Sequence, residues 1–372
     1  MDVLELSRDL VRFDTVNPPG DERACAEHLG RLLEEAGFEV RSFEFASGRT
    51  SLVARLGGSS DRSPLCFAGH IDTVPLGAAP WSHDPFLGEV ADGRLYGRGS
   101  SDMKSGVAAF VIAAHRLAGR LRASPGLVLV IVAGEETGCD GSRHLAALSG
   151  ALGEAGAIVI AEPTGNYPFV GHKGALWLHA RASGVTAHGS MPERGVNAIY
   201  KGARAVGKLE RFAFDAEPHP VLGSPTLNVG TISGGLNINS VPDGVTVGID
   251  IRTIPDLKHE DLLERLTEYL GEEVTLAPIV DVRGVWTDPS HPWMEEIFEL
   301  ATPIVGTRPV VRGAPYFTDA SALTPAYGGP PTVILGPGEM ELAHQTDEYC
   351  RVDRLEQAVE LYVEIARRWC GI

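Results

Sequence analysis

The chain has 372 residues, of which 44% are hydrophobic and 22% are charged, a balance typical of folded proteins and unlike that of disordered chains. Aspartate and glutamate outnumber lysine and arginine by 49 to 32, which gives a formal net charge of -17. This charge opposes binding to nucleic acid and to anionic membranes. The five cysteines are widely spaced and form no CxxC pair, so we expect neither a disulfide framework nor a cysteine zinc site.

The first residues, Met1–Glu5, show neither the basic nor the apolar stretch of a secretory signal. No later apolar run approaches the roughly 18 to 20 residues that cross a bilayer. We therefore expect a cytoplasmic protein with no membrane span. At roughly 100 to 200 residues per domain, the length predicts two or three structural units.

In the first half of the chain, apolar runs rich in valine, isoleucine and alanine alternate with longer amphipathic stretches. Residues 126–133 are short, β-branched and hydrophobic, which predicts a central strand, whereas the alanine-rich segment Met103–Leu117 predicts a helix. Strands buried on both faces and flanked by helices are typical of an α/β layered domain. Runs of the same style are Ser51–Leu56, Leu65–Ile71 and Ala157–Ala161.

A different pattern begins at about Leu176, where apolar and polar residues alternate with a period of two. The elements predicted from there are a strand, a helix, two strands, a helix and a strand. This order is that of a ferredoxin-like sandwich and predicts an inserted α+β domain. The predicted segments after the first strand are Asn197–Arg211, Leu227–Ile232, Val245–Ile251, Glu260–Leu270 and a strand near Val274.

The α/β style resumes after about Arg283, with a helix at Trp293–Ala301, a strand at Thr332–Leu335 and a terminal helix at Asp353–Trp369. The expected domains are therefore residues 1–174 and 284–372, which form the two parts of one domain, and the inserted residues 175–283.

Candidate catalytic residues lie where the predicted strand Leu65–Ile71 ends, in the segment GHIDTVP (residues 69–75). In open α/β sheets, ligands gather beyond the carboxyl ends of the strands. The period of two puts His70 and Asp72 on one face, so the carboxylate could accept the second N–H of a metal-bound His70. A histidine that only makes hydrogen bonds is the alternative.

Other acidic residues and a histidine stand at comparable junctions. Asp102 lies between a glycine-rich turn and the alanine-rich helix, where an ordinary helix cap is the alternative. Glu135 and Glu136 leave the central strand as neighbours and point to opposite sides, so one could bind a metal while the other acts as a base, unless both are simply solvated. Glu162 follows the strand that ends at Ala161, and His344 lies late in the chain.

With Asp72 and one of the two neighbouring glutamates set aside for other roles, these positions supply two imidazoles and three carboxylates, without thiolate. Such a set is too large for one catalytic zinc and suits two metals that share a bridging carboxylate. Two metals held in this way can acidify a water and polarise a carbonyl. The residues therefore point to a metal-assisted hydrolase.

The same segments occur in order across nearly the whole chain as longer motifs. The sequence resembles the dinuclear zinc amidohydrolases that include acetylornithine deacetylase, succinyl-diaminopimelate desuccinylase, aminoacylase and the glutamate-releasing carboxypeptidases. The resemblance implies a zinc-peptidase-like α/β/α catalytic domain with an inserted ferredoxin-like lid and dimerisation domain. The motifs are GHIDTVP, WSHDPFLGEVADGRLYGRGSSDMKSG, AGEETG, AEPTG, AHGSMPERGVNAI and LGPGEMELAHQTDEY.

The resemblance also implies roles for single residues. One metal would be held by His70, Asp102 and Glu162, and the other by Glu136, His344 and the same Asp102. The metals would be two zinc ions, for which cobalt or manganese could substitute, with a water bridging them. Glu135 would be the general base, Asp72 would orient His70, and the peptide between Asp102 and Met103 would be cis.

In the inserted domain the resemblance points to three residues. His188 would reach into the active site of a partner subunit and stabilise the oxyanion, which implies a homodimer. Asn239 and Arg252 would hold the substrate carboxylate or the oxyanion region, although a salt bridge at a strand end is the alternative for Arg252.

The implied activity is hydrolysis of the amide bond of an N-acyl amino acid, and we expect a small acyl group such as acetyl. The loop Gly313–Asp319 departs from the Gly-Gly-Thr-Ser-Asp loop of the desuccinylases, and Tyr316 and Phe317 would narrow an acyl pocket. The alternatives are a desuccinylase-type deacylase, a dipeptidase or carboxypeptidase with the same metal site, and a non-catalytic metal-binding protein. Intact Glu135 and a full ligand set disfavour the last.

Overall fold

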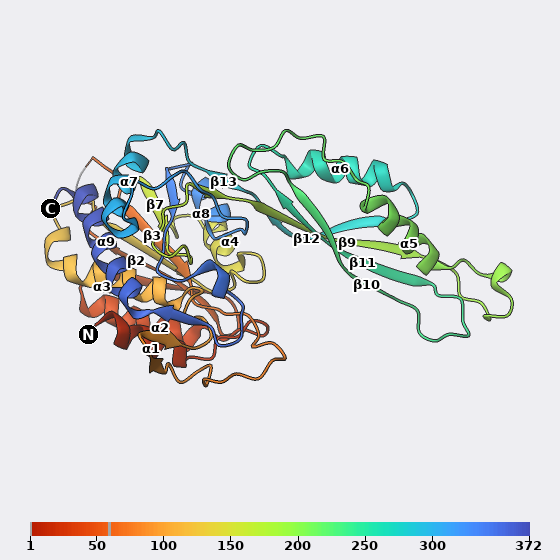
Figure 1. Ribbon diagram of the computed structural model, residues 1–372, viewed down its shortest axis with the longest axis horizontal. Helices are drawn as coiled ribbons and strands as arrows, with labels where there is room; N and C mark the ends of the chain where they lie inside the picture. Colours follow the sequence, from red (N-terminus) through yellow and green to blue (C-terminus); the bar gives the residue numbers. More distant parts are fainter. Residues whose placement is uncertain (1, 59–60) are drawn as a thin grey trace. The chain divides into compact units, whose positions relative to one another are not determined.

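The computed structural model describes residues 2–58 and 61–372. The described chain forms two compact units, labelled by element in Figure 1. The first contains the chain up to Gly171 together with Trp286–Arg312 and Thr318–Ile372, and the second contains His172–Val285 and Gly313–Phe317. Short strands β8 (Gly171–His172) and β13 (Val285–Trp286) lie where the chain passes from one unit to the other.

The first unit is built on a sheet in which six described strands run in the order β1-β2-β6-β3-β7-β14. The first two strands are antiparallel to their neighbours, whereas β6, β3, β7 and β14 are mutually parallel. The carboxyl ends of these four strands therefore share one edge of the sheet. The strands are β1 (Glu39–Ala46), β2 (Arg49–Leu56), β3 (Leu65–His70), β6 (Leu127–Val132), β7 (Ala157–Ile160) and β14 (Thr332–Ile334).

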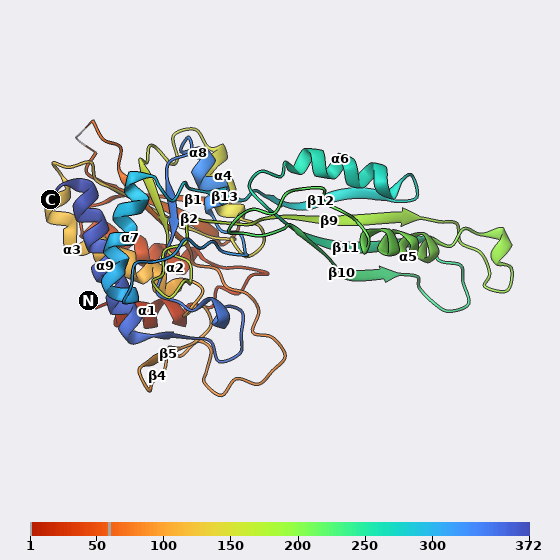
Figure 2. The ribbon, with the colours of Figure 1, turned by 45° about the horizontal axis from the view of Figure 1, so that its top comes forward.

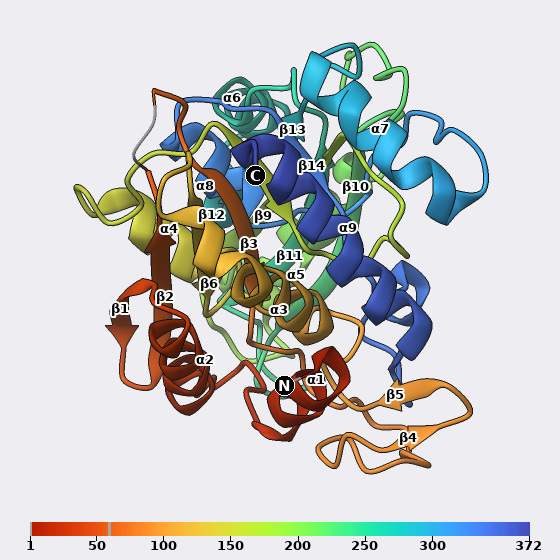
Figure 3. The ribbon, with the colours of Figure 1, turned by 90° about the vertical axis from the view of Figure 1, so that its left-hand side faces the viewer.

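Helices cover both faces of this sheet. One layer, seen in front of the strands in Figure 3, consists of α1 (Val3–Arg12), α2 (Arg23–Glu35), α3 (Lys104–Leu121), α7 (Pro292–Val305) and α9 (Val352–Cys370). Its apolar side chains form one continuous buried cluster with those of the sheet, and their removal from water stabilises the layer. On the other face, α4 (Asp140–Ala147) lies beside α8 (Ala320–Ala326). The predicted α/β layered fold is confirmed.

Glycines let backbone segments approach closely at the edge of the sheet where the four parallel strands end. A Cβ atom at Gly106, in the first turn of α3, would lie 2.1 Å from the carbonyl oxygen of Ala161, and one at Gly336 would lie 2.2 Å from the same atom. Any side chain at these positions would push the segments apart. The absence of side chains therefore lets Asp102, just before α3, lie close to Glu162.

A small sheet in the order β15-β5-β4 joins two distant parts of the first unit. Its strands are β4 (Val90–Ala91), β5 (Arg94–Tyr96) and β15 (Tyr349–Arg351), and Tyr349 pairs with Tyr96. Because the segment before Asp102 follows β5 and His344 precedes β15, this pairing brings their two loops together. The short 3-10 helix Met340–Leu342 lies just before His344.

The second unit has the ferredoxin-like order that the sequence predicts. Its elements are β9 (Gly174–Ser183), the 3-10 helix Pro192–Arg194, α5 (Ala198–Leu209), β10 (Thr226–Gly234), β11 (Gly244–Thr253), α6 (His259–Leu270) and β12 (Thr275–Val282). The sheet runs β10-β11-β9-β12 with every pair antiparallel. Figure 2 shows α5 and α6 lying along this sheet, where they cover its apolar face.

No helix within residues 2–58 and 61–372 combines the length and the apolar content that crossing a bilayer requires.

Candidate metal centre and active site

Two groups of metal-binding side chains meet at one aspartate. His70 ends β3, Glu162 follows β7, and Asp102 stands just before α3. The imidazole Nε2 of His70 lies 3.2 Å from Oδ1 of Asp102 and 3.8 Å from Oε1 of Glu162. One ligand atom from each of the three residues lies within 4.8 Å of the others. This group can hold a metal ion.

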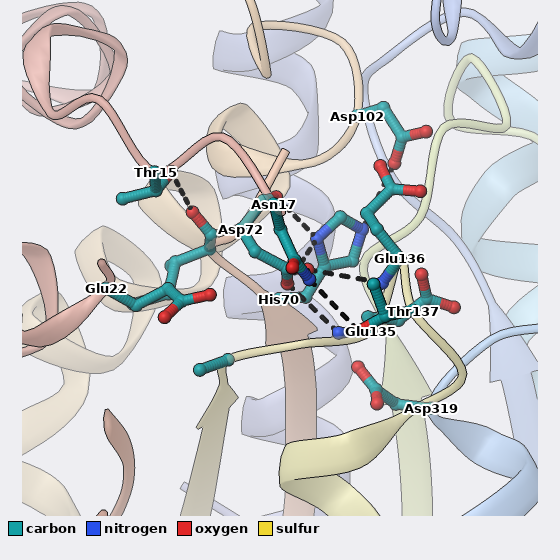
Figure 4. Close-up of polar contacts among 12 residues, drawn as sticks. Thr15, Asn17, Glu22, His70, Asp72, Asp102, Glu135, Glu136, Thr137 and Asp319 are labelled. Atoms are coloured by element: carbon teal, nitrogen blue, oxygen red, sulfur yellow. Dashed lines mark hydrogen bonds and ion pairs between the residues drawn. The ribbon is translucent and has the colours of Figure 1, made fainter. Parts of the chain in front are cut away.

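The second group lies on the other oxygen of the same carboxylate. Nε2 of His344 is 3.4 Å from Oδ2 of Asp102 and 3.1 Å from Oε2 of Glu136, and one ligand atom from each of these three residues lies within 4.8 Å of the others. Figure 4 shows Asp102 above His70, with Glu136 beside both. Asp102 thus offers one oxygen to each group, which is the geometry of a bridging ligand. The peptide between Asp102 and Met103 is cis, as the resemblance implies.

The buried carboxylates of this cluster favour the binding of cations. Burial raises the pKa of Glu136 and, together with repulsion from Asp102, raises that of Glu162 well above its usual range. Burial alone would also raise the pKa of Asp102, but hydrogen bonds from His344 and His70 hold it below its ordinary value. The hydrogen bonds to Asp102 and Glu136 raise the pKa of His344 to about 10. Metal cations would neutralise the negative charge that these buried carboxylates concentrate, and the donor set, without thiolate, fits zinc, cobalt or manganese.

Asp72 is buried beneath the first group and organises the loop after β6. Its Oδ1 accepts a hydrogen bond from the backbone N–H of Glu135 at 3.1 Å, and its Oδ2 accepts one from that of Glu136 at 3.2 Å. Nδ1 of His70 lies 3.0 Å from the backbone oxygen of Asp72 and 3.5 Å from its carboxylate. The sequence predicts that the Asp72 carboxylate orients the His70 imidazole. In the structure the backbone carbonyl of Asp72 is the closer acceptor, because the Asp72 side chain points toward the loop that carries Glu135.

Asn17 completes this arrangement and has no counterpart in the sequence predictions. Its side-chain amide donates to Oδ2 of Asp72 at 2.9 Å and to the hydroxyl of Thr137 at 3.1 Å, as Figure 4 shows. Burial would raise the pKa of Asp72, but contacts with His70, Asn17 and the Glu135 amide outweigh it and lower that pKa. The carboxylate therefore stays charged. In the sequence, Pro18 and Pro19 follow Asn17 and indicate a turn. This turn is the signal that could have pointed to Asn17.

Glu135 lies beside the two groups and is only 5% exposed. Burial raises the pKa of its carboxyl well above the usual range, and repulsion by Glu162 and Glu136 adds to that shift. A carboxylate with a raised pKa can take up a proton and release it again near neutral pH. These properties suit the general-base role that the resemblance implies for Glu135.

Asp319 is a second buried acid near this site that the sequence did not reveal. One of its oxygens accepts a hydrogen bond from the hydroxyl of Ser142 at 2.6 Å, while the other is buried without a hydrogen-bond partner. Burial raises the pKa of Asp319 to about 6, and Figure 4 shows it below Glu135. Its partner Ser142 lies 177 residues away, so no local pattern pointed to it.

The remaining predicted site residues belong to the second unit. His188 is exposed, and its Nδ1 lies 2.8 Å from the hydroxyl of Ser190. Its segment pairs with the segment that carries Asn239, because the N–H of Gly189 donates to the Asn239 carbonyl.

Arg252, on β11, forms an ion pair of 3.0 Å with Asp250. Its guanidinium also lies 5.9 Å from the ring centre of Trp177 and 5.8 Å from that of Phe317. Arg252 therefore forms the salt bridge that was the alternative to a substrate-binding role, and its guanidinium also lies beside two aromatic rings.

Comparison with known proteins decides the family. A sequence model of peptidase family M20/M25/M40 matches residues 66–368. The chain belongs to this family. A probable succinyl-diaminopimelate desuccinylase of Staphylococcus epidermidis is 30% identical over 401 residues, covering 99% of this chain and 98% of that protein. An acetylornithine deacetylase of Vibrio parahaemolyticus is 30% identical over 360 residues and covers 92% and 91% of the two chains.

Solved structures of M20 members share the fold. A metallo-carboxypeptidase of Sulfolobus solfataricus superposes with a TM-score of 0.83 at 18% identity and covers 100% of both chains. A dinuclear metal-binding peptidase of Bacillus subtilis gives a TM-score of 0.73 at 16% identity and covers 99% and 98%. Family membership makes this M20 protein an enzyme that hydrolyses amide bonds, which confirms the hydrolytic class expected from the sequence.

Proposed function

We propose that the protein is a dinuclear zinc enzyme that removes a small acyl group, such as acetyl, from an N-acyl amino acid. The observation that carries the proposal is Asp102, which offers one oxygen to each of two ligand groups while Glu135 lies beside them. His70 and Glu162 would complete one zinc site, and Glu136 and His344 the other. Cobalt or manganese would fit the same donors.

When bound, two zinc ions acidify a shared water and polarise the amide carbonyl that it attacks. Glu135 would accept the proton of the attacking water and return it to the leaving amine. Its burial and the repulsion from neighbouring acids keep its proton affinity high enough for this shuttle. Asp72 and Asn17 hold the backbone that carries Glu135, so the base keeps a fixed position.

The second unit would supply substrate recognition. The Arg252 guanidinium suits a substrate carboxylate, and the rings of Trp177 and Phe317 beside it would contact apolar substrate atoms. Asn239 would contribute an amide donor, and His188 of a second copy would stabilise the oxyanion. In this proposal residues 1–174 and 284–372 form the catalytic domain, and residues 175–283 form the lid and dimerisation domain.

A homodimer is part of the proposal, and the second unit offers a surface for it. Strand β10 is an edge strand, and the loop after it presents Leu236 and Ile238, which are 97% and 104% exposed. Tyr200 on α5 is 65% exposed. An unpaired edge beside exposed apolar side chains favours pairing with a second copy.

A cytoplasmic location is also part of the proposal. The cysteines, all free in the described chain, are compatible with the reducing conditions there.

Light scattering coupled to gel filtration tests the dimer. Ile238→Glu should give a monomer, whereas Leu87→Glu, at an exposed apolar position in the first unit, should leave the mass unchanged. A wild-type protein that is monomeric at micromolar concentration would remove the dimer from the proposal.

A second candidate, a peptidase acting on free dipeptides, would use the same metals and base. Several solved relatives carry peptidase names, among them the Sulfolobus carboxypeptidase, and the desuccinylase and deacetylase relatives are equally similar to this chain. The difference would lie in the side chains that contact the acyl group, such as Phe317, and not in the metal ligands.

Amine release from a panel of substrates separates these functions. The panel contains N-acetyl, N-succinyl and N-formyl amino acids and free dipeptides, with zinc-loaded wild type and Glu135→Ala compared at equal zinc content. We expect acetylated amino acids to be preferred and the variant to be inactive. Activity on dipeptides alone would favour the peptidase, and turnover by Glu135→Ala would remove Glu135 from its role.

A further inference from the structure

A buried glutamate in the first unit gathers the backbone that leads to Asp102. The carboxylate of Glu348 is completely buried and accepts four hydrogen bonds. They come from the guanidinium of Arg98 at 2.7 Å and from the backbone N–H groups of Gly99 at 3.0 Å, Ser101 at 2.7 Å and Asp102 at 2.9 Å. Three backbone contacts from four successive residues to one side chain fix the path of this turn up to Asp102 itself.

The main chain around Glu348 is bound to the same region. The carbonyl oxygen of Glu348 accepts from the N–H of Gly97 at 2.9 Å, next to the pairing of β15 with β5. The preceding carboxylate, that of Asp347, accepts from the N–H of Ser82 at 2.8 Å. The segment that begins with His344 is therefore bound both to the turn before Asp102 and to the loop that leads into β4.

We propose that Glu348 is a positioning residue that holds the bridging Asp102 and the ligand His344 in one fixed arrangement. The inference rests on the proposed dinuclear function. Glu348 contacts the backbone of Asp102 and not the candidate metal positions, so it acts through Asp102. Because it lies four residues after His344 on the same segment, its contacts relate a ligand of the second group to the ligand shared by both.

The charges in this contact make the carboxylate hard to replace. An ionised acceptor binds backbone N–H groups more strongly than a neutral one, and Arg98 balances its charge in the buried site. Glutamine has the same shape, but its nitrogen is a donor and faces N–H groups that need an acceptor. Glu348→Gln therefore removes part of the scaffold with little change in volume.

The chain offers a matched control in a second buried ion pair. Glu22 is also completely buried, and its carboxylate accepts from Nε of Arg49 at 2.8 and 3.1 Å. This carboxylate contacts no backbone amide of a candidate ligand. Glu22→Gln makes the same chemical change in the same kind of pair and reports the cost of losing a buried charge that does not bind the backbone of residues 99–102.

The experiment compares wild type, Glu348→Gln, Glu348→Asp and Glu22→Gln as full chains. Zinc affinity is measured by competition with a chelator, and the visible spectrum of the cobalt-loaded protein reports the ligand geometry. Hydrogen exchange of the amides of residues 99–102 is followed with and without zinc. Melting temperature shows whether each variant is folded.

We expect Glu348→Gln to weaken zinc binding by about 10- to 100-fold, to alter the cobalt spectrum and to speed exchange of residues 99–102. Glu348→Asp keeps the acceptor charge on a shorter side chain and should be intermediate, which keeps the test available if the glutamine variant fails to fold. Glu22→Gln should lower the melting temperature with unchanged zinc affinity and spectrum. On the best substrate, kcat should fall in the Glu348 variants while KM is retained.

Unchanged zinc affinity, spectrum and exchange in both Glu348 variants would overturn the proposal, as would an equal loss of zinc affinity in Glu22→Gln. Failure of the proposed function gives a different result. In that case the wild type would bind zinc without releasing amine from any substrate in the panel, while the exchange and cobalt readouts would still distinguish Glu348→Gln from Glu22→Gln.

Discussion

Replacing Asp72 by asparagine tests how the loop after β6 is held. The two carboxylate oxygens of Asp72 accept from the backbone N–H groups of Glu135 at 3.1 Å and Glu136 at 3.2 Å, and Oδ2 also accepts from Asn17 at 2.9 Å. Asparagine keeps the volume but offers one acceptor oxygen and a donor. At least one of the two backbone groups therefore loses its partner.

The magnitude follows from burial. A buried N–H left without an acceptor costs about 1 to 3 kcal/mol, and Asp72 is completely buried, so water cannot take over. The loop that carries Glu136 then loosens, and zinc affinity should fall by about 10- to 100-fold, the usual effect of losing a residue that supports metal ligands. Because Glu135 shares the loop, kcat should fall as well.

The assay combines zinc affinity from chelator competition with urea unfolding of the metal-free protein. Asp140→Asn is the matched control, because Asp140 accepts a single hydrogen bond at 3.0 Å from the hydroxyl of Thr137 and an asparagine oxygen can still accept it. If Asp72→Asn matched Asp140→Asn in both measurements, the supporting role of Asp72 would be refuted.

Three further predictions concern packing, pH and metal. In α3, Gly106→Ala places a methyl group against the Ala161 carbonyl and should destabilise the protein by about 1 to 3 kcal/mol in urea unfolding. Gly119→Ala, which meets open space in the same helix, should be neutral or stabilising by up to about 1 kcal/mol. Burial lowers the pKa of His172 to about 4, so the folded state favours its neutral form. The contribution of this neutral imidazole to the free energy of unfolding is fully present above pH 6.5 and is lost as the pH falls toward 4. Between pH 7 and 5 this amounts to about 2 kcal/mol, which should appear as a shallower pH slope in His172→Gln than in wild type and not in the exposed-site control His115→Gln. Removing metal with a chelator should lower the melting temperature, because ligand at about 1,000 times its Kd adds roughly 4 kcal/mol of stability; an unchanged melting temperature would contradict a metal centre at Asp102.

The parts of the fold that the sequence predicted are those with a strong local period. Within the predicted run at 126–133, Leu127–Val132 form a buried strand because their β-branched residues fit a sheet covered on both faces. The alternation from Leu176 and the helices that follow it specify the ferredoxin-like order. Boundaries were less accurate: α7 extends to Val305 and includes Pro303, four residues beyond the predicted end at Ala301.

The parts that could not be predicted depend on contacts between distant segments. Strands β15 and β5 are three residues each and pair residues about 250 positions apart, so neither carries a local signal. Asn17 reaches the site through side-chain contacts with the distant Asp72 and Thr137, and Asp319 is held by the distant Ser142. Glu348 acts through backbone amides, which carry no sequence signal. The candidate ligands were accessible from the sequence because each follows a recognisable strand or turn.

The most direct test of the account measures amine release and zinc content on the same samples of wild type and Glu135→Ala, with N-acetyl amino acids as substrates. We expect two zinc ions per chain in both proteins, amine release by the wild type and none by the variant. Two bound zinc ions without release of amine from any acylated amino acid or dipeptide, or full turnover by Glu135→Ala, would contradict the proposed function.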